Sequence, residues 1–298
     1  MRAALEASGL GKRYGRRWAL SDCTVSMPSG HVVGLVGPNG AGKTTLLHLA
    51  VGLLVPTTGT VSVLGEHPAA GPQGLARVGF LAQDSPLYGR LTVAQHLRMG
   101  EWLNPRWDTG FATKRMQDLE LDPSQRAGTL SGGQRAQLAL TLAVAKHPDL
   151  LLLDEPVASL DPLARREFLQ TLMEVVASRD VSVVLSSHLI GDLERVCDHM
   201  VVLVSGHVAL TGDVEELLAT HVRLVGPRRD PLNLPSTLTV IEDSHAERQT
   251  SLLVRTDGPV LDPAWSVLPV TMEDIVLAYM RQARDAGRPT STGLAVAR

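Results

Sequence analysis

Apolar residues recur along this chain with both a strand-like and a helix-like spacing. Continuous apolar runs at 31–36, 150–153 and 181–186 predict buried strands, because the strands of a parallel sheet are covered on both faces. In the segment between the first two runs, apolar residues recur every three to four positions, which indicates helices. Those helices are predicted at 91–103, 113–121 and 134–145. The pattern therefore predicts an α/β fold built on a mainly parallel sheet.

The remaining segments add three parts to this core. Short alternating stretches at 5–10 and 18–25 predict an antiparallel edge sheet. The helices form a helical subdomain, at about 84–146, inserted into a domain that covers 1–218. A small α+β extension is predicted at 219–284, with short strands followed by a helix at 272–283. Further strands are predicted at 56–63, 78–82, 222–225, 237–241, 252–255 and 265–270, and residues 285–298 are expected to form a flexible tail.

Composition excludes several classes of protein. With 298 residues and 44% hydrophobic content, the chain can bury a large core. A formal net charge of −3 gives no reason to expect a nucleic-acid partner. Cys23 and Cys197 lie far apart and fit no zinc pattern, so we expect two reduced thiols. No apolar run is long enough to span a membrane, and we expect a cytoplasmic protein.

A phosphate-binding loop follows the first apolar run. Residues 37–44 read Gly-Pro-Asn-Gly-Ala-Gly-Lys-Thr, with Thr45 next, and match G-x-x-x-x-G-K-[ST]. In such a loop backbone N–H groups surround phosphate oxygens, the lysine reaches the outer phosphates, and the hydroxyl meets Mg²⁺. The alternative is a glycine-rich turn that binds nothing, but a strand before the loop and a helix after it favour phosphate. The motif predicts a P-loop NTPase core.

Polar residues at the ends of later segments fit the same site. Asp154 and Glu155 follow the leucine run, where they could hold Mg²⁺ and polarise water or form a solvated turn; the P-loop favours the first. His188 follows the third strand and is either a polar cap or a contact to a γ-phosphate. Residues 130–134, Leu-Ser-Gly-Gly-Gln, open a helix that Ser131 is placed to cap, which makes a second anion site. Tyr14 is either structural or an adenine-stacking aromatic.

Together these segments resemble the ATP-binding subunit of ATP-binding cassette (ABC) transporters, over roughly residues 1–218. Seven motifs occur in the family's order. They are Tyr14, the P-loop at 37–44, Gln83, the signature at 130–134, Asp154-Glu155, Ser159-Leu160-Asp161 and His188. The chain departs from the family at 135–137 and 157–158, outside the expected phosphate and Mg²⁺ contacts, so a competent ATPase is expected.

The resemblance implies that ATP and Mg²⁺ bind between two such chains, since the signature of one subunit faces the P-loop of another. It implies that Glu155, His188 and Gln83 are catalytic, and that Thr44, Gln83 and Asp154 hold the metal. The residues expected to contact ATP are Tyr14, Gly37, Pro38, Asn39, Gly40, Ala41, Gly42, Lys43, Thr44 and Thr45 of one chain, and Ser131, Gly132, Gly133 and Gln134 of the other. Intact motifs permit a homodimer.

The resemblance also implies a membrane partner. A chain of this type works on the inner face of the cell membrane, peripherally, with a separately encoded permease, and the groove beside Gln83, from about 84 to 103, is the expected contact. The segment 270–277, Val-Thr-Met-Glu-Asp-Ile-Val-Leu, is similar to the end of exporter cassettes and favours export over import. The alternative is a soluble ABC-type ATPase acting on ribosomes, DNA or iron–sulfur assembly. No residue in the chain identifies the transported substrate.

Overall fold

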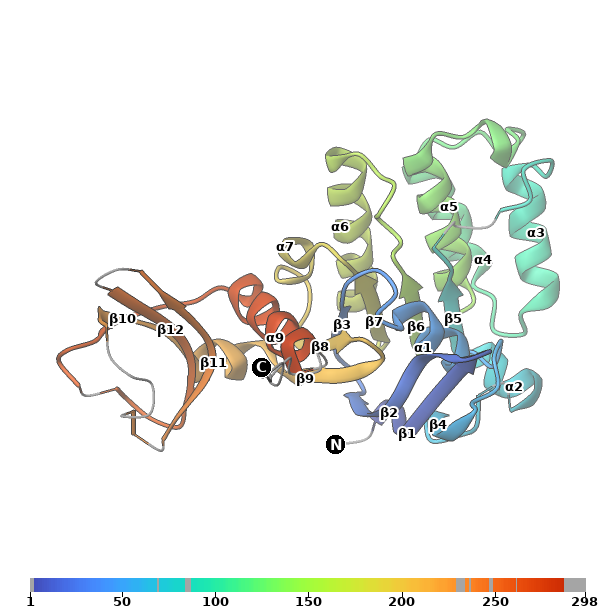
Figure 1. Cartoon of the computed structure of the whole chain (residues 1–298). Coiled ribbons are helices and arrows are strands. Elements are labelled where there is room, and N and C mark those ends of the chain that lie inside the picture. The colour runs from blue at the N-terminus through green and yellow to red at the C-terminus, as the bar shows by residue number, and fades with distance from the viewer. Residues whose placement is uncertain are drawn as a thin grey trace, which may run out of the picture. The chain divides into compact units, whose positions relative to one another are not determined.

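The computed structural model describes residues 3–68, 70–83, 87–228, 234–235, 237–246, 249–260 and 262–286. The chain divides into two compact units, residues 1–211 and 212–298, and each is described by itself. Within the described residues, no helix combines the length and the apolar character needed to cross a membrane. Most of the elements are labelled in Figure 1.

The first unit is built on a sheet with the strand order β5-β6-β7-β3-β8-β9. Its bounds are β5 (Val78–Leu81), β6 (Leu150–Asp154), β7 (Ser182–Ser187), β3 (Val32–Val36), β8 (His199–Val204) and β9 (His207–Asp213). Strands β5, β6, β7, β3 and β8 pair in parallel, and every residue of β3, β6 and β7 is buried. Their carboxyl ends therefore meet at one edge of the sheet, where open α/β sheets bind ligands.

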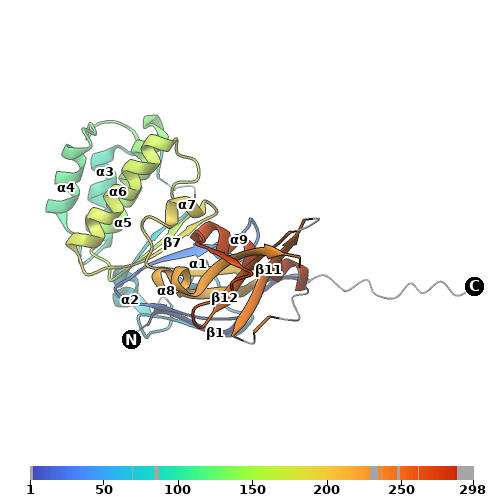
Figure 2. The same ribbon diagram turned by 90° about the vertical axis from the view of Figure 1, so that its left-hand side faces the viewer.

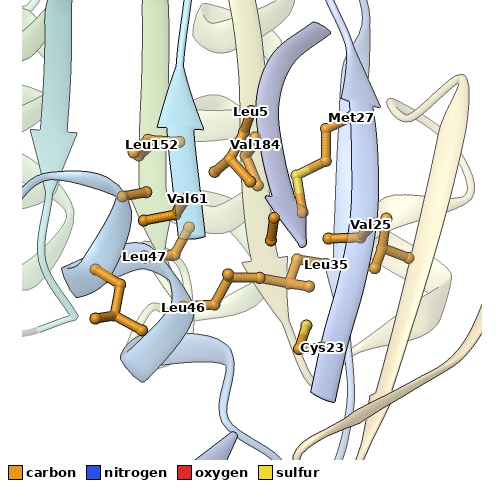
Figure 3. Packing of buried hydrophobic residues seen from close by; sticks show 14 of the residues in the cluster. Leu5, Cys23, Val25, Met27, Leu35, Leu46, Leu47, Val61, Leu152 and Val184 are labelled. Atoms are coloured by element: carbon orange, nitrogen blue, oxygen red, sulfur yellow. The ribbon is translucent and has the colours of Figure 1, made fainter. Parts of the chain in front are cut away.

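A second, antiparallel sheet covers this core, as the alternating N-terminal segments predict. Its order is β2 (Arg17–Pro28), β1 (Ala3–Tyr14) and β4 (Thr58–Val63). Helix α1 (Lys43–Ala50) follows the phosphate loop. Side chains of both sheets and of α1 share one hydrophobic cluster, in which Leu5, Leu35 and Leu46 are fully buried (Figure 3). This packing fixes the position of the loop between β3 and α1.

Helices between the strands form the region predicted at about 84–146. They are α3 (Val93–Leu103), α4 (Thr109–Asp118), the short 3₁₀ turn η1 (Ala127–Thr129) and α5 (Gly132–Ala145). Figure 2 shows these helices on one side, together with α6 (Pro162–Ser178). The prediction that α4 begins at residue 113 was wrong, because the Asp108 side chain accepts a hydrogen bond from the Phe111 N–H at 2.8 Å and caps the helix earlier. Two short helices, α2 (Gly71–Arg77) and α7 (Ile190–Leu193), complete the unit.

The described residues of the second unit form a four-stranded antiparallel sheet and two helices. The sheet order is β11 (Leu238–His245), β12 (Gln249–Thr256), β10 (His221–Pro227) and β13 (Ser266–Leu268). Helix α8 (Val214–Thr220) precedes the sheet and α9 (Met272–Ala286) follows it. The expected α+β extension is therefore present, but α9 includes residues 285 and 286, which the sequence assigns to the tail. The rest of that tail, 287–298, lies outside the described residues.

Candidate functional site

The loop between β3 and α1 needs glycine at two positions for different reasons. A Cβ on Gly37 would lie 2.3 Å from the carbonyl oxygen of Leu203, so a side chain would displace β8. Gly42 has a φ of +109°, and a Cβ there would lie 2.6 Å from the carbonyl oxygen of Ala19. Helix α1 begins at Lys43 without a side-chain cap. Its first N–H groups are therefore open to an anion, as the motif predicts.

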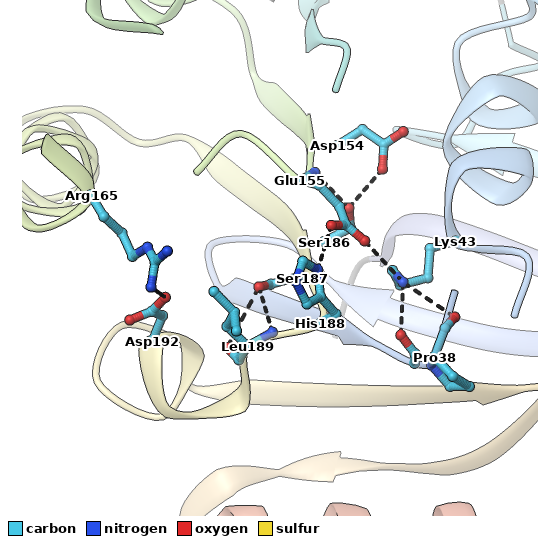
Figure 4. Close-up of polar contacts among 11 residues, drawn as sticks. Pro38, Lys43, Asp154, Glu155, Arg165, Ser186, Ser187, His188, Leu189 and Asp192 are labelled. Atoms are coloured by element: carbon cyan, nitrogen blue, oxygen red, sulfur yellow. Dashed lines mark hydrogen bonds and ion pairs between the residues drawn. The ribbon is translucent and has the colours of Figure 1, made fainter. Parts of the chain in front are cut away.

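Lys43 lies at the centre of this loop and is 5% exposed. Its Nζ donates to the carbonyl oxygens of Gly37 at 2.7 Å and Pro38 at 3.5 Å. The same Nζ lies 3.1 Å from Oε1 of Glu155. The ammonium thus joins the phosphate loop to the end of strand β6 (Figure 4).

Glu155 is held on its other side by His188. Its Oε2 lies 2.6 Å from Nδ1 of His188, whose side chain is 42% exposed. Burial by itself raises the pKa of Glu155, but the hydrogen bonds and charges of Lys43 and His188 outweigh burial and hold the pKa below its ordinary value. Glu155 also has a φ of +46°, in the left-handed region that non-glycine residues seldom adopt. Its carboxylate is therefore ionised and fixed in direction.

Asp154 is fully buried beside this pair. Its Oδ1 accepts a 2.7 Å hydrogen bond from the hydroxyl of Ser186, and that hydroxyl oxygen accepts the backbone N–H of Glu155 at 2.9 Å. The other oxygen, Oδ2, has no hydrogen-bond partner among the described residues. A buried carboxylate oxygen without a donor is a suitable ligand for a hard cation.

This donor set fits Mg²⁺ in particular. In the described part of the chain no group of three or more His, Cys, Asp or Glu side chains could hold a metal. Mg²⁺ does not need such a group, because it binds through one or two carboxylates together with substrate phosphates and waters. Thr44 and Gln83, the other predicted ligands, line the cavity that contains Lys43 and Glu155.

That cavity has a volume of about 520 Å³. Of the predicted site residues, its walls include Tyr14, Asn39, Gly40, Ala41, Gly42, Lys43, Thr44, Thr45, Gln83 and Glu155. Gly37, Pro38, Asp154 and His188 are not in the walls, although all four touch Lys43, Ser186 or Glu155. The structure thus brings most of the P-loop, Gln83 and Glu155 to one cavity, and Ser186 links Asp154 to Glu155 beside it.

The signature residues lie elsewhere. Ser131, Gly132, Gly133 and Gln134 line a separate cavity of about 490 Å³, together with the segment 159–161. The prediction that Ser131 caps the helix is confirmed: its hydroxyl accepts the Gln134 N–H at 3.2 Å, and Gln134 Oε1 accepts the Ser131 N–H at 3.0 Å. Within one chain, the signature and the P-loop line two separate cavities.

Sequence reasoning missed two residues of the P-loop site. Ser186 orients both Asp154 and Glu155, but a serine near the end of an apolar strand carries no signal of that role. Arg17 lines the nucleotide-sized cavity beside Tyr14. The register of a hairpin with the two-residue turn Gly15-Arg16 could have placed Arg17 opposite Tyr14.

Comparisons with known proteins agree with this geometry. The family model described as ABC transporter matches residues 20–158. The thiamine import ATP-binding protein ThiQ of Salmonella choleraesuis is 33% identical over 203 residues, which cover 66% of this chain and 86% of that protein. The Nod factor export ATP-binding protein I of Cupriavidus metallidurans is 30% identical over 312 residues, which cover 96% of this chain and 100% of that protein.

A solved structure of an ABC protein has the same fold. The ATP-binding subunit of an ABC transporter superposes with a TM-score of 0.65 and 29% sequence identity, covering 72% of this chain and 92% of that one. The P-loop core predicted from the motifs is therefore confirmed, as is the resemblance to this family. The chain belongs to the family of ABC transporter ATP-binding proteins and is an ATP-binding subunit of that class.

Proposed function

We propose that two copies of this chain hydrolyse Mg²⁺-ATP between them and drive export through a separately encoded permease. The observation that carries the catalytic part is the placement of Glu155, whose two carboxylate oxygens contact Lys43 and His188 at the mouth of the phosphate loop. Glu155 orients and partly deprotonates the attacking water, and His188 stabilises the γ-phosphate as its charge shifts. Gln83 lines the cavity, where it would hold the attacking water and Mg²⁺.

The ion pair between Lys43 and Glu155 links phosphate binding to base strength. Phosphate oxygens compete with the Glu155 carboxylate for the Lys43 ammonium, because the ammonium has only three donors and the loop carbonyls already accept from it. When Lys43 binds phosphate instead, Glu155 loses one of the two partners that lower its pKa and becomes a stronger base. Asp154, Thr44 and Gln83 would hold Mg²⁺, which would neutralise phosphate charge.

Two separate half-sites support the dimer. The capped N-terminus of α5 offers the backbone N–H groups of Gly132 and Gly133, but they line a different cavity from the P-loop. A triphosphate carrying three to four negative charges binds best between convergent donors in a water-poor cleft. A second copy would bring its signature residues to the P-loop of the first copy, and the first copy would bring its own signature residues to the P-loop of the second.

An apolar groove supports the permease contact. Its volume is about 590 Å³, and it is lined by α1, α2, β5 and α5, with the exposed side chains of Leu53 and Leu75. Of the expected contact segment 84–103, only Leu87 is among the described lining residues. Lys146 also lines the groove; burial lowers its pKa, and no carboxylate in the described ranges pairs with it. A permease segment with apolar side chains and one carboxylate would cover this surface at the inner face of the membrane.

A charge placed in this groove should prevent the chain from binding its permease. Leu53→Glu puts a carboxylate on a 64% exposed leucine of the groove, which an apolar partner segment would have to desolvate. We expect the amount of membrane-spanning permease that co-purifies with the chain from detergent-solubilised membranes to fall at least about tenfold. Val55→Glu is the matched control, because Val55 is 76% exposed and does not line the groove.

Equal recovery of the permease with both variants would contradict docking in the groove. Absence of any membrane protein in the wild-type preparation would instead favour an ABC-type ATPase that is not coupled to transport. Transport by the wild-type complex in inside-out vesicles also reveals the direction of transport, because an exporter accumulates its cargo inside such vesicles when ATP is added outside them. Export is supported by the Nod factor export relative, whose match includes the C-terminal unit, whereas the match to the thiamine import relative covers 66% of the chain.

Ser186 should stabilise the fold as well as the site. Ser186→Ala removes the donor to Asp154 and leaves the Glu155 N–H without its acceptor, and both groups are buried. We expect the free energy of unfolding to fall by about 1–3 kcal/mol and ATP turnover to fall with it. Urea denaturation measures the first and phosphate release the second. Ser178→Ala, on the surface end of α6, is the control, and equal stability of both variants would contradict the role given to Ser186.

A further inference from the structure

The hairpin between β1 and β2 carries four large side chains in a defined register. Tyr14 pairs with Arg17, and Arg13 pairs with Trp18, across a turn of Gly15 and Arg16. Residues directly opposite on antiparallel strands project from the same face, and successive residues project from opposite faces. The register therefore places Tyr14 with Arg17 on one face and Arg13 with Trp18 on the other.

Contacts agree with this division into faces. The Arg13 guanidinium lies over the Trp18 ring, 5.4 Å from its centre. Tyr14 and Arg17 both line the P-loop cavity, whereas Arg13, Arg16 and Trp18 do not. The tyrosine that is available to stack on adenine thus has an arginine as its direct cross-strand neighbour.

Arg17 reaches the phosphate loop itself. Its Nη2 lies 3.6 Å from the position that a Cβ on Gly40 would occupy. Gly40 has a φ of +78° and lies between Asn39 and Ala41, which also line the cavity. The guanidinium is therefore beside the loop whose backbone N–H groups are expected to receive phosphate.

The charges that line the cavity leave Arg17 without a counterion. In the described part of the chain, the cavity walls carry two cations, Arg17 and Lys43, and one anion, Glu155. Lys43 pairs with Glu155 at 3.1 Å, whereas no described residue forms an ion pair with Arg17. The cavity thus presents an unpaired guanidinium beside a phosphate loop, and guanidinium groups bind phosphate through paired N–H donors.

We propose that Arg17 binds phosphate oxygens of the nucleotide and is a determinant of affinity for nucleotides with a phosphate chain. This inference rests on the nucleotide site proposed above. Tyr14 then contacts the base while its cross-strand neighbour contacts the phosphates, so one hairpin binds both parts of the nucleotide. Because Arg17 is exposed and has no ion pair within the described ranges, its replacement removes no ion pair from the fold.

The test compares ligands with and without phosphates on the purified full chain. Isothermal titration with ATP, ADP and adenosine gives Kd for the wild type, Arg17→Ala, Arg17→Lys and Arg16→Ala. We expect Arg17→Ala to raise the Kd for ATP and for ADP about tenfold, as for the loss of a hydrogen-bonded charge at an exposed site. The Kd for adenosine should stay within about twofold of the wild-type value. Arg17→Lys keeps the positive charge but loses the paired N–H donors of the guanidinium. Its Kd for ATP should lie between those of the wild type and Arg17→Ala. Arg16→Ala is the charge-matched control in the same turn and should behave as the wild type.

Added salt provides a second readout. Wild-type affinity for ATP should fall more steeply with ionic strength than the affinity of Arg17→Ala, because one charge pair is lost in the variant. Unchanged ATP affinity in Arg17→Ala, with normal binding by the wild type, would overturn the role of Arg17 alone. Equal losses for ATP and adenosine would overturn the phosphate contact in favour of a contact to the base. Failure of the wild type to bind ATP would overturn the nucleotide site itself.

Discussion

Replacing Glu155 with glutamine should reduce ATP hydrolysis by about 10²- to 10⁴-fold while ATP still binds, as expected for the loss of a general base. The amide keeps the size of the side chain and can still accept from Lys43 at Oε1, but it cannot take a proton from water. With hydrolysis blocked, the dimer that ATP closes should persist. Phosphate release measures the rate, and size-exclusion chromatography with ATP and Mg²⁺ measures the dimer.

The control for this variant is Glu174→Gln, which makes the same chemical change at an exposed glutamate of α6. Its hydrolysis rate should match the wild type. A Glu155→Gln variant that hydrolyses ATP at the normal rate would show that another group activates the water. A variant that fails to dimerise with ATP, although it binds ATP, would contradict the two-chain site.

Replacing Lys43 with alanine should weaken ATP binding by at least about 100-fold, because charge-assisted hydrogen bonds to phosphate are lost. A second cause adds to the first. Glu155 is 7% exposed and loses its cationic partner in the variant, so an uncompensated carboxylate faces the phosphates. Equilibrium binding of a fluorescent ATP analogue measures the effect, and Lys114→Ala, at an exposed lysine of α4, is the control.

The two causes can be separated with a double variant. If repulsion by Glu155 contributes, Lys43→Ala combined with Glu155→Gln should bind ATP more tightly than Lys43→Ala alone, by about tenfold. Equal affinity of the single and double variants would assign the whole loss to the missing ammonium. Wild-type affinity in Lys43→Ala would contradict the placement of phosphate at this loop.

Local chemistry made the phosphate loop and several helix starts predictable. The positive φ of Gly42 and the capping box of Ser131 and Gln134 depend on residues within a few positions of each other. Helix α6 was not predicted, although the sequence contains a signal for its start. Asp161 caps the helix by accepting hydrogen bonds from the N–H groups of Leu163 and Ala164, and Pro162 occupies the first helical position. Strand β8 was also not predicted.

The buried strands were predictable for a related reason. The leucines of β6 are buried on both faces, so their apolar character appears as a continuous run rather than an alternation. The carboxyl ends of such strands share one edge, which is why Asp154, Glu155 and His188 could be placed near the P-loop before any contact was known. The interpretation as an ABC-type ATPase depended on that order of motifs.

The sequence by itself therefore determined the core fold, the phosphate loop and the family, because they follow from short-range patterns and from the order of the motifs along the chain. Only the tertiary structure decided which side chains meet. Ser186 joins Asp154 and Glu155 from 32 and 31 positions away, and Arg17 reaches Gly40 only because the chain folds the hairpin beside the loop. The separation of the P-loop and the signature into two cavities is likewise a property of the packed chain. Side-chain direction and long-range register depend on packing, and no local pattern of residues contains them.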